Sequence, residues 1–197
     1  MQAQARPENL DSWWNSLQQE LADQPIAAEE TELPLRSDEG VQCYDVQLSS
    51  WGSYRIFGYL SVPTEGTGPF PAYYYLPRYQ SVMEVVQQGD CVDRRKECVT
   101  FSIGCRGQRN CEDPFRGEIP GLLTEGIDHA GSWPMRGWVA DCLRGMEYLL
   151  SRPEVDSQRV AGIGFNDFSL LTAALHSGLC CVSSVPGLFL NIGERLS

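Results

Sequence analysis

The fold is decided by residues 151–168, which read Ser151-Arg-Pro-Glu-Val-Asp-Ser-Gln-Arg-Val160 and then Ala161-Gly-Ile-Gly-Phe-Asn-Asp-Phe168. Val160–Ile163 is a short apolar run that predicts a buried strand, and Asp167–His176 has a helical pattern. The strand and the helix are separated only by the residues around Gly164, so the chain turns tightly between them. This junction predicts a strand that runs directly into a helix.

Strands and helices alternate on both sides of this junction. Ala72–Leu76 and Cys98–Ile103 are predicted strands, and the continuous apolar run of the first is typical of a strand covered on both faces. Met135–Leu150 has one apolar helical face and ends just before a proline, which disfavours helix in the residue before it. Val82–Gln88 predicts a helical piece and Cys180–Val185 a further strand. The alternation predicts an α/β fold with a mostly parallel central sheet flanked by helices.

The N-terminal part has a different pattern. Residues 9–23 predict an amphipathic helix, and the polar, acidic residues 24–40 predict a connecting segment. Val41–Leu48 and Tyr54–Val62 predict antiparallel strands, joined by a hairpin turn at Ser49–Ser53. We therefore expect two parts, an N-terminal helix and acidic connector over residues 1–40 and an α/β domain over residues 41–197.

A functional site is expected at one edge of the parallel sheet. Ligands of such sheets bind at the carboxyl ends of the strands, so the loops after Leu76, Ile103 and Gly164 are the ones to inspect. The aromatic run Tyr73-Tyr74-Tyr75 precedes the first of these loops. We interpret it as core packing with one or two hydroxyls reaching the edge, and sugar stacking is the alternative.

Charge and composition exclude several classes of protein. The chain has 15 Lys+Arg and 26 Asp+Glu, for a net charge of −11. This acidity argues against a nucleic-acid partner, because phosphate binding needs clustered basic side chains. No apolar run reaches the roughly 18 residues of a membrane span, and the start Met1-Gln-Ala-Gln-Ala-Arg lacks the pattern of a signal peptide. We expect a cytoplasmic protein.

The cysteines and histidines predict no metal site and no cofactor. None of the eight cysteines forms a C-x-x-C pair, and His129 and His176 lie near no regular cysteine spacing. We expect most cysteines to be buried thiols, including the pair Cys180-Cys181. Cys105 and Cys111 flank a loop and could cross-link in an oxidising compartment.

Several segments resemble one enzyme family, the acetyl xylan esterases and cephalosporin C deacetylases, which are α/β-hydrolases. They are Arg106-Gly107-Gln108, Pro120-Gly-Leu-Leu-Thr-Glu-Gly-Ile-Asp128, Arg136 with Asp141-Cys-Leu-Arg144, and Ser151–Val160. The resemblance implies an α/β-hydrolase-like domain that is C-terminally short and lacks the last strands of the sheet. It also implies self-association, because the family is oligomeric.

The catalytic pattern of the family is changed at its central turn. The family carries Gly-x-Ser-Gln-Gly, whereas this chain reads Gly164-Phe165-Asn166-Asp167-Phe168. Asn166 stands at the position of the nucleophile, and a carboxamide is a very poor nucleophile. Asp167 stands where the family has a glutamine, whose backbone N–H helps to stabilise the oxyanion. The backbone N–H could still do so here, but the Asp167 carboxylate beside it opposes developing negative charge. Phe168 replaces the closing glycine, which predicts a distorted or splayed turn.

Two alternative roles for the residues of this turn follow from the sequence. Asn166-Asp167 at the start of a helix is typical of an N-cap. Asp167 could instead be a carboxylate nucleophile, but it lies one position past the apex of the turn. We therefore favour the capping role.

The other catalytic groups of the family are also replaced. The second oxyanion donor comes from a His-Gly-Tyr turn, and the matching residues here are Pro77, Arg78 and Tyr79, of which only the tyrosine is kept. His176 is the only histidine after the turn, and at 1.5 Å rise per residue it lies roughly 15 Å along the helix from Asn166. His129 is interpreted as a loop residue rather than a catalytic base. The chain therefore does not contain a complete Ser-His-Asp set.

Arg106, Gly107 and Gln108 match a motif of the family. We interpret the arginine as a brace that pairs with a carboxylate such as Asp128 or Asp141, and contact with substrate is the alternative. Gly164 is likewise interpreted as a structural residue of the motif.

These observations favour a catalytically degenerate member of the family that acts as a structural or interaction subunit. The partner would be another protein chain or a second copy, placed against residues 180–196, because the strand over 180–185 forms an open sheet edge. The first alternative is a carbohydrate ester hydrolase, a deacetylase, completed by another chain or by further C-terminal residues. The second is a non-catalytic carbohydrate-binding module that binds its ligand in the pocket that holds the active site in the family.

Overall fold

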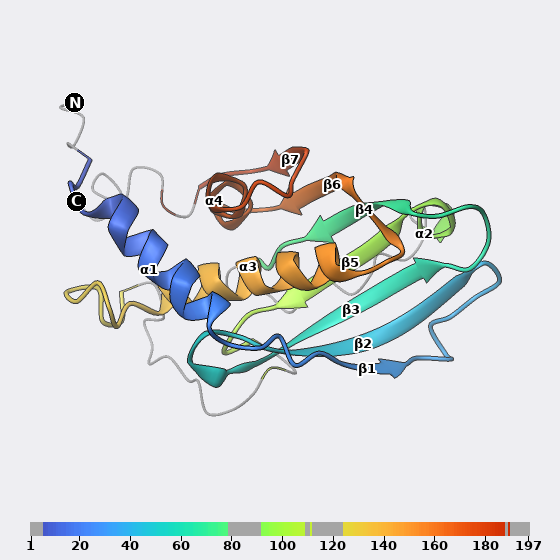
Figure 1. Ribbon diagram of the computed structural model, residues 1–197, viewed down its shortest axis with the longest axis horizontal. Coiled ribbons are helices and arrows are strands. Elements are labelled where there is room, and N and C mark those ends of the chain that lie inside the picture. The colour runs from blue at the N-terminus through green and yellow to red at the C-terminus, as the bar shows by residue number, and fades with distance from the viewer. Residues whose placement is uncertain (1–5, 79–91, 109–110, 112–123, 188, 190–197) are drawn as a thin grey trace.

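The computed structural model describes residues 6–78, 92–108, 111, 124–187 and 189 as one twisted sheet with helices packed on it (Figure 1). The helices are α1 (Leu10–Ala22), α2 (Val92–Glu97), α3 (Pro134–Ser151) and α4 (Phe168–Leu175), with a 3₁₀ turn η1 (Trp51–Ser53). The strands are β1 (Glu29–Glu32), β2 (Val41–Ser49), β3 (Arg55–Pro63), β4 (Phe70–Tyr75), β5 (Val99–Gly104), β6 (Val155–Gly164) and β7 (Cys181–Ser184).

The predicted α/β sheet is confirmed. Its strand order is β1-β2-β3-β5-β4-β6-β7. The strands β5, β4, β6 and β7 pair in parallel, whereas β1, β2 and β3 pair antiparallel with their neighbours. The long crossover from β4 to β6 passes through β5 and α3, which places the carboxyl ends of the parallel strands at one edge of the sheet.

The predicted connector over residues 24–40 contains a strand that the sequence does not reveal. All four residues of β1 are exposed, and β1 pairs with the outer edge of β2. Its sequence Glu-Glu-Thr-Glu has no apolar side chain and therefore no alternation to detect. Ion pairs to two arginines, Arg55–Glu29 and Arg152–Glu30, hold this strand in place. The division of the chain at residue 40 stays a prediction.

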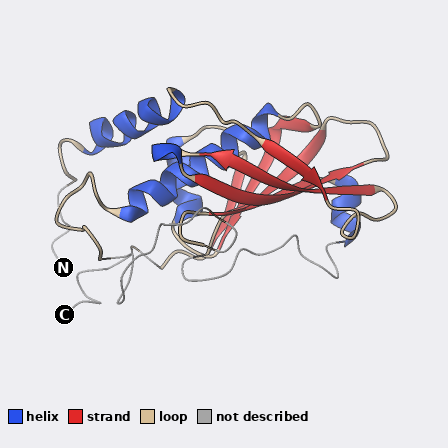
Figure 2. Ribbon diagram, turned by 90° about the horizontal axis from the view of Figure 1, so that it is seen from below, coloured by secondary structure: helices blue, strands red, loops and turns tan. Residues whose placement is uncertain are grey.

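The helix α3 is the centre of the helical layer. It lies along the sheet, and α1 crosses it at the end of the molecule opposite to α2 (Figure 1). Figure 2 shows the helices and the twisted sheet edge-on. Because α3 is covered on two sides, nearly all of its residues are buried, not only the predicted apolar face. Within the described ranges, no helix combines the length and the apolar composition needed to cross a membrane.

Two buried arginines of α3 attach α1 to the rest of the fold. Arg144 donates to the backbone carbonyls of Leu21 (2.6 Å) and Gln24 (3.0 Å), at and just beyond the C-terminus of α1, where a cation interacts favourably with the helix. Arg136 donates to the Ser16 hydroxyl at 3.0 Å. These bonds explain why charged residues lie on a buried helix.

The tyrosine run of β4 is part of the core, as predicted. Tyr74 is fully buried, stacks on Phe101 with ring centroids 5.9 Å apart, and donates its hydroxyl to the Cys142 carbonyl at 2.8 Å. Tyr75 is also buried. Tyr73 is half-buried and lies under the guanidinium of Arg94. The predicted helix at Val82–Gln88 lies outside the described residues.

Candidate functional site

The loops that follow the parallel strands meet around Asn166, as the topology predicts. The Asn166 side-chain amide donates to the Pro77 carbonyl after β4 at 3.1 Å. The Gln108 amide, after β5, donates to the Arg78 carbonyl at 2.9 Å. The Ser184 hydroxyl at the end of β7 donates to the Asn166 carbonyl at 3.0 Å. Segments from four strands are therefore joined at one point.

Both ends of the Asn166 carboxamide are held by hydrogen bonds. Its Nδ2 donates to Pro77, and its Oδ1 accepts from the backbone N–H of Phe168 at 3.1 Å. The residue is only 5% exposed. The Oδ1 bond to an N–H two residues ahead is the Asx turn that is typical of helix starts. The predicted capping role therefore belongs to Asn166, since Asp167 makes no side-chain cap.

The backbone at Asn166 is relaxed. Among the described non-glycine residues, only Ala27 and Ser53 have a positive φ, whereas a nucleophile elbow is a sharp, strained turn. The prediction of a splayed turn is wrong at Gly164, because a Cβ there would lie 2.7 Å from the Cβ of Ser169. Strand and helix therefore stay in close contact. Phe168, in place of the closing glycine, is fully buried and directs its ring away from that contact, against Trp138.

The carboxylate of Asp167 is used inside the protein. It accepts hydrogen bonds from the backbone N–H groups of Gly187 (3.2 Å) and Phe189 (2.8 Å) and is 7% exposed. These bonds hold the loop after β7 against the start of α4. The geometry does not favour Asp167 as a nucleophile, because its lone pairs face backbone donors.

The segment after β4 carries a cation where the resemblance places an oxyanion donor. Pro77 is buried and offers only its carbonyl, because proline has no N–H. Arg78 is exposed, and its guanidinium lies 5.3 Å from the centroid of the Phe165 ring. Tyr79 lies outside the described residues.

Arg106, Gly107 and Gln108 form the brace that the sequence predicts. Arg106 pairs with Asp141 through two bonds, from Nε (2.9 Å) and Nη2 (2.7 Å), and both residues are buried. Burial lowers the pKa of Arg106, but the adjacent Asp141 carboxylate offsets this effect and leaves the pKa raised. Asp128, the other candidate partner, is exposed. Gly107 has a φ of +78° that favours glycine, and Gln108 closes the turn by accepting from the Cys105 N–H at 2.7 Å.

Neither histidine contributes to this site. His176 caps the far end of α4, and its Nδ1 accepts from the Gly178 N–H at 3.0 Å. His129 lies in an exposed turn in which its backbone N–H donates to Gly126. In the described part of the chain, neither imidazole is hydrogen-bonded to Asn166.

The seven cysteines within the described residues are free thiols, and the prediction that Cys180 and Cys181 are buried is wrong. Both are exposed, with their sulfur atoms 3.9 Å apart, because they lie at the start of β7, which is the last strand of the sheet among the described residues. Cys105 is buried and is 3.9 Å from the sulfur of Cys142, not bonded to Cys111. Burial raises the pKa of Cys111 to about 12.

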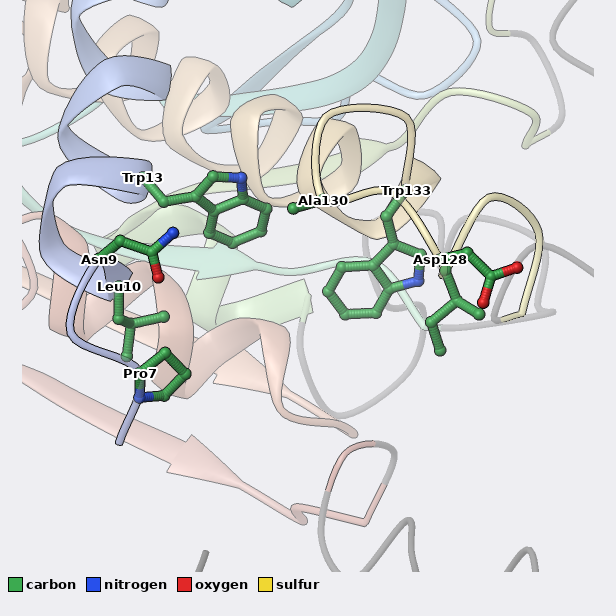
Figure 3. A pocket seen from close by; sticks show the side chains of 8 residues that line it. Pro7, Asn9, Leu10, Trp13, Asp128, Ala130 and Trp133 are labelled. Carbon is green, nitrogen blue, oxygen red and sulfur yellow. The ribbon is translucent and has the colours of Figure 1, made fainter. Parts of the chain in front are cut away.

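One cavity was not predicted from the sequence. It has a volume of about 440 Å³ and lies between the start of α1 and the loop before α3 (Figure 3). The aromatic walls are Trp13 and Trp133. The sequence assigned Trp13 to the apolar face of a helix, and no periodic signal links it to Trp133. The other lining residues are Pro7, Asn9, Leu10, Ile127, Asp128 and Ala130.

Several solved structures share this architecture. Acetyl xylan esterase 1 from Thermoanaerobacterium sp. JW/SL YS485 superposes with a TM-score of 0.84 at 23% identity, covering 98% of this chain and 62% of that one. The acetyl xylan esterase from Paenibacillus sp. R4 has a TM-score of 0.79 at 21% identity, covering 91% and 60%. These similarities show the fold of an α/β-hydrolase.

Sequence comparison identifies the same group of proteins. Acetyl esterase Axe7A from Xylanibacter ruminicola is 23% identical, over 92% of this chain and 44% of the relative. The chain therefore spans about half the length of this curated relative. A sequence profile described as acetyl xylan esterase (AXE1) matches residues 1–186. Because that match covers most of the sequence, the chain belongs to the acetyl xylan esterase family.

Proposed function

We propose that this chain is a catalytically inactive member of the acetyl xylan esterase family that acts as a structural or interaction subunit. The observation that carries the proposal is the state of Asn166, whose side chain connects the end of β4 to the start of α4. A hydrolase of this fold needs an exposed, activated oxygen at the apex of the turn. Here a buried amide fills that position and acts as a clamp.

The surrounding groups support the same conclusion. A carboxamide has no proton that a base could remove to make a nucleophile. The backbone N–H of Phe168 already donates to Asn166, and the Asp167 carboxylate brings negative charge to a place where an oxyanion would form. Several independent parts of an acyl-transfer site are therefore changed together.

Hydrolysis of p-nitrophenyl acetate tests this proposal. We expect the wild type and Asn166→Ser both to match the buffer blank, because a serine without a base stays a hydroxyl. Asn166→Ala should lower the free energy of unfolding by about 1–3 kcal/mol, since buried hydrogen-bond partners lose their amide. Turnover by the wild type that Asn166→Ala abolishes would contradict the proposal, and so would clear turnover by Asn166→Ser.

The subunit contacts a second copy of this chain along residues 180–196. What supports this is the position of β7, which pairs with β6 on one side and has no strand on its other side among the described residues. Unpaired backbone groups on a sheet edge are a template for another strand. Val185, at the end of β7, is 66% exposed, and Leu170 on the neighbouring α4 is 45% exposed. Exposed apolar side chains therefore lie just after β7 and on the helix α4.

Light scattering combined with thiol labelling tests this interface. We expect a mass above that of the monomer, and slower reaction of Cys180 and Cys181 with Ellman's reagent as the protein concentration rises. Cys111 serves as an internal reference, because a pKa of about 12 leaves little thiolate at pH 8. Cys180→Ser/Cys181→Ser assigns the labelled thiols. A monomer at all concentrations, with both cysteines equally reactive throughout, would refute the contact.

A further inference from the structure

The cavity between α1 and the loop at 124–133 has the features of a built binding site. Figure 3 shows the side chains of Trp13 and Trp133 on opposite walls, with Ala130 between them. Pro7 and Leu10 extend the wall formed by α1. A volume of about 440 Å³ lies within the range of small-molecule pockets.

Both indoles are held in place by contacts outside the cavity. The ring of Trp13 packs on Trp14 with centroids 4.4 Å apart, and Arg136 lies 5.4 Å from the Trp13 centroid. Trp133 makes an edge contact with Phe189 at 5.7 Å, and Phe189 is itself anchored through its N–H to Asp167. Fixed aromatic walls lose little entropy when a ligand binds.

Two polar side chains accompany the aromatic walls. Asn9 begins α1, but its carboxamide makes no capping hydrogen bond. Asp128 is exposed beside Trp133 (Figure 3). The cavity therefore combines flat apolar surfaces with a side-chain amide and a carboxylate among its lining residues.

We propose that this cavity binds a neutral oligosaccharide, with pyranose rings on the indoles of Trp13 and Trp133 and hydroxyls bonded to Asn9 and Asp128. A pyranose presents a flat apolar C–H face together with polar edges, and the two tryptophans and the polar rim match these two features. The cavity is separate from Asn166, so the proposal does not depend on whether the chain is inactive.

The charges around the cavity favour a neutral ligand over a charged one. Asp128 lines it, and Glu8 lies between two lining residues, so an anion would be repelled. The Trp13 ring already interacts with the Arg136 guanidinium, so a second cation on that ring would meet like charge. A purely apolar chain would use the rings and leave the polar rim without a function.

Calorimetry and NMR on the full chain test the proposal. The probes are xylotetraose and cellotetraose as neutral chains and tetragalacturonic acid as the charged comparison. We expect saturable binding of a neutral chain and none of the anion. The indole N–H signals of Trp13 and Trp133 should shift on titration, whereas that of the buried Trp138 should not.

Variants assign the binding to the cavity. Trp13→Ala and Trp133→Ala should each weaken binding about tenfold, because each removes one stacking surface. Leu35→Ala, which changes an exposed apolar residue outside the cavity lining and outside the proposed contact between copies, is the matched control and should leave binding unchanged. Asn9→Ala and Asp128→Asn, both at exposed positions, test the rim without disturbing the core.

Three outcomes would overturn the proposal. The first is the absence of both heat and indole shifts with every neutral chain. The second is binding that Leu35→Ala weakens as much as Trp133→Ala does. The third is self-association that Trp133→Ala abolishes in the absence of sugar, which would make the cavity an interface between copies.

Discussion

Replacing Asp141 with alanine lowers the free energy of unfolding by about 3–5 kcal/mol, because it leaves a buried charge without its partner. Asp141 is fully buried and accepts hydrogen bonds from Ser50 Oγ (2.5 Å) and from the Arg106 backbone N–H (2.9 Å) in addition to the guanidinium. The Arg106 side chain is 3% exposed, so water does not replace the lost carboxylate. Urea denaturation followed by tryptophan fluorescence measures the change.

The matched control for this variant is an exposed ion pair. Glu29 lies 3.0 Å from Arg55 with a side chain that is 76% exposed, so Glu29→Ala should change stability by at most about 1 kcal/mol. Asp141→Asn keeps the shape and removes the charge, and it should destabilise the protein nearly as much as Asp141→Ala. If Asp141→Ala were as stable as Glu29→Ala, the brace would not hold the fold together.

The elements of the fold that sequence predicts well are those with a periodic apolar pattern. The helix α1 and the strand β2 lie where the residues indicate, because each buries one face more deeply than the other. The strand β3 also lies where its aromatic and β-branched residues indicate, although it is buried along nearly its whole length. The strand β1 could not be predicted, since its four residues are all exposed and it is held by backbone pairing and by ion pairs to Arg55 and Arg152. A pattern of side-chain burial carries no information about such a strand.

The location of the candidate site could be predicted from the sequence, but the hydrogen bonds and packing contacts within it could not. The topology of parallel strands identifies the loops that meet at Asn166, and residue chemistry identifies a carboxamide as a poor nucleophile. The bond from Asn166 to the Pro77 carbonyl depends on two segments 89 residues apart. The pairing of Trp13 with Trp133 is equally non-local. The first contact follows from the pairing of β4 with β6, and the second from the packing of α1 beside the start of α3, and neither follows from local sequence.

The exposed cysteines of β7 show a limit of the same reasoning. An apolar pair in a predicted strand of an α/β sheet is expected to be buried, because inner strands are covered on both faces. Cys180 and Cys181 are exposed because β7 is the edge strand, with the burial pattern of an uncovered surface. The exposure of these cysteines is therefore determined by the position of β7 in the sheet, and that position depends on strand pairing.

Replacing Gly145 with alanine destabilises the protein by about 2–4 kcal/mol, although alanine is the better helix former. Helix propensity alone would stabilise the variant by up to about 1 kcal/mol. A Cβ at position 145 would, however, lie 2.2 Å from the Tyr74 hydroxyl oxygen and 3.1 Å from Cγ2 of Ile103. The Tyr74 ring is fully buried, so the variant forces overpacking and breaks the Tyr74–Cys142 hydrogen bond.

A double-mutant cycle separates these two causes. Tyr74→Phe removes the hydroxyl that the new methyl group meets, so Gly145→Ala should be less harmful in that background, with a coupling energy of about 1 kcal/mol or more. Gly131→Ala is the control, because nothing lies within 4 Å of its Cβ position. Helix propensity alone predicts that Gly145→Ala raises the unfolding midpoint. That result would contradict the close contact between Gly145 on α3 and Tyr74 on β4. Equal losses in both backgrounds would assign the damage to the ring carbon of residue 74 (3.0 Å) and to Ile103 (3.1 Å), and not to the Tyr74 hydroxyl.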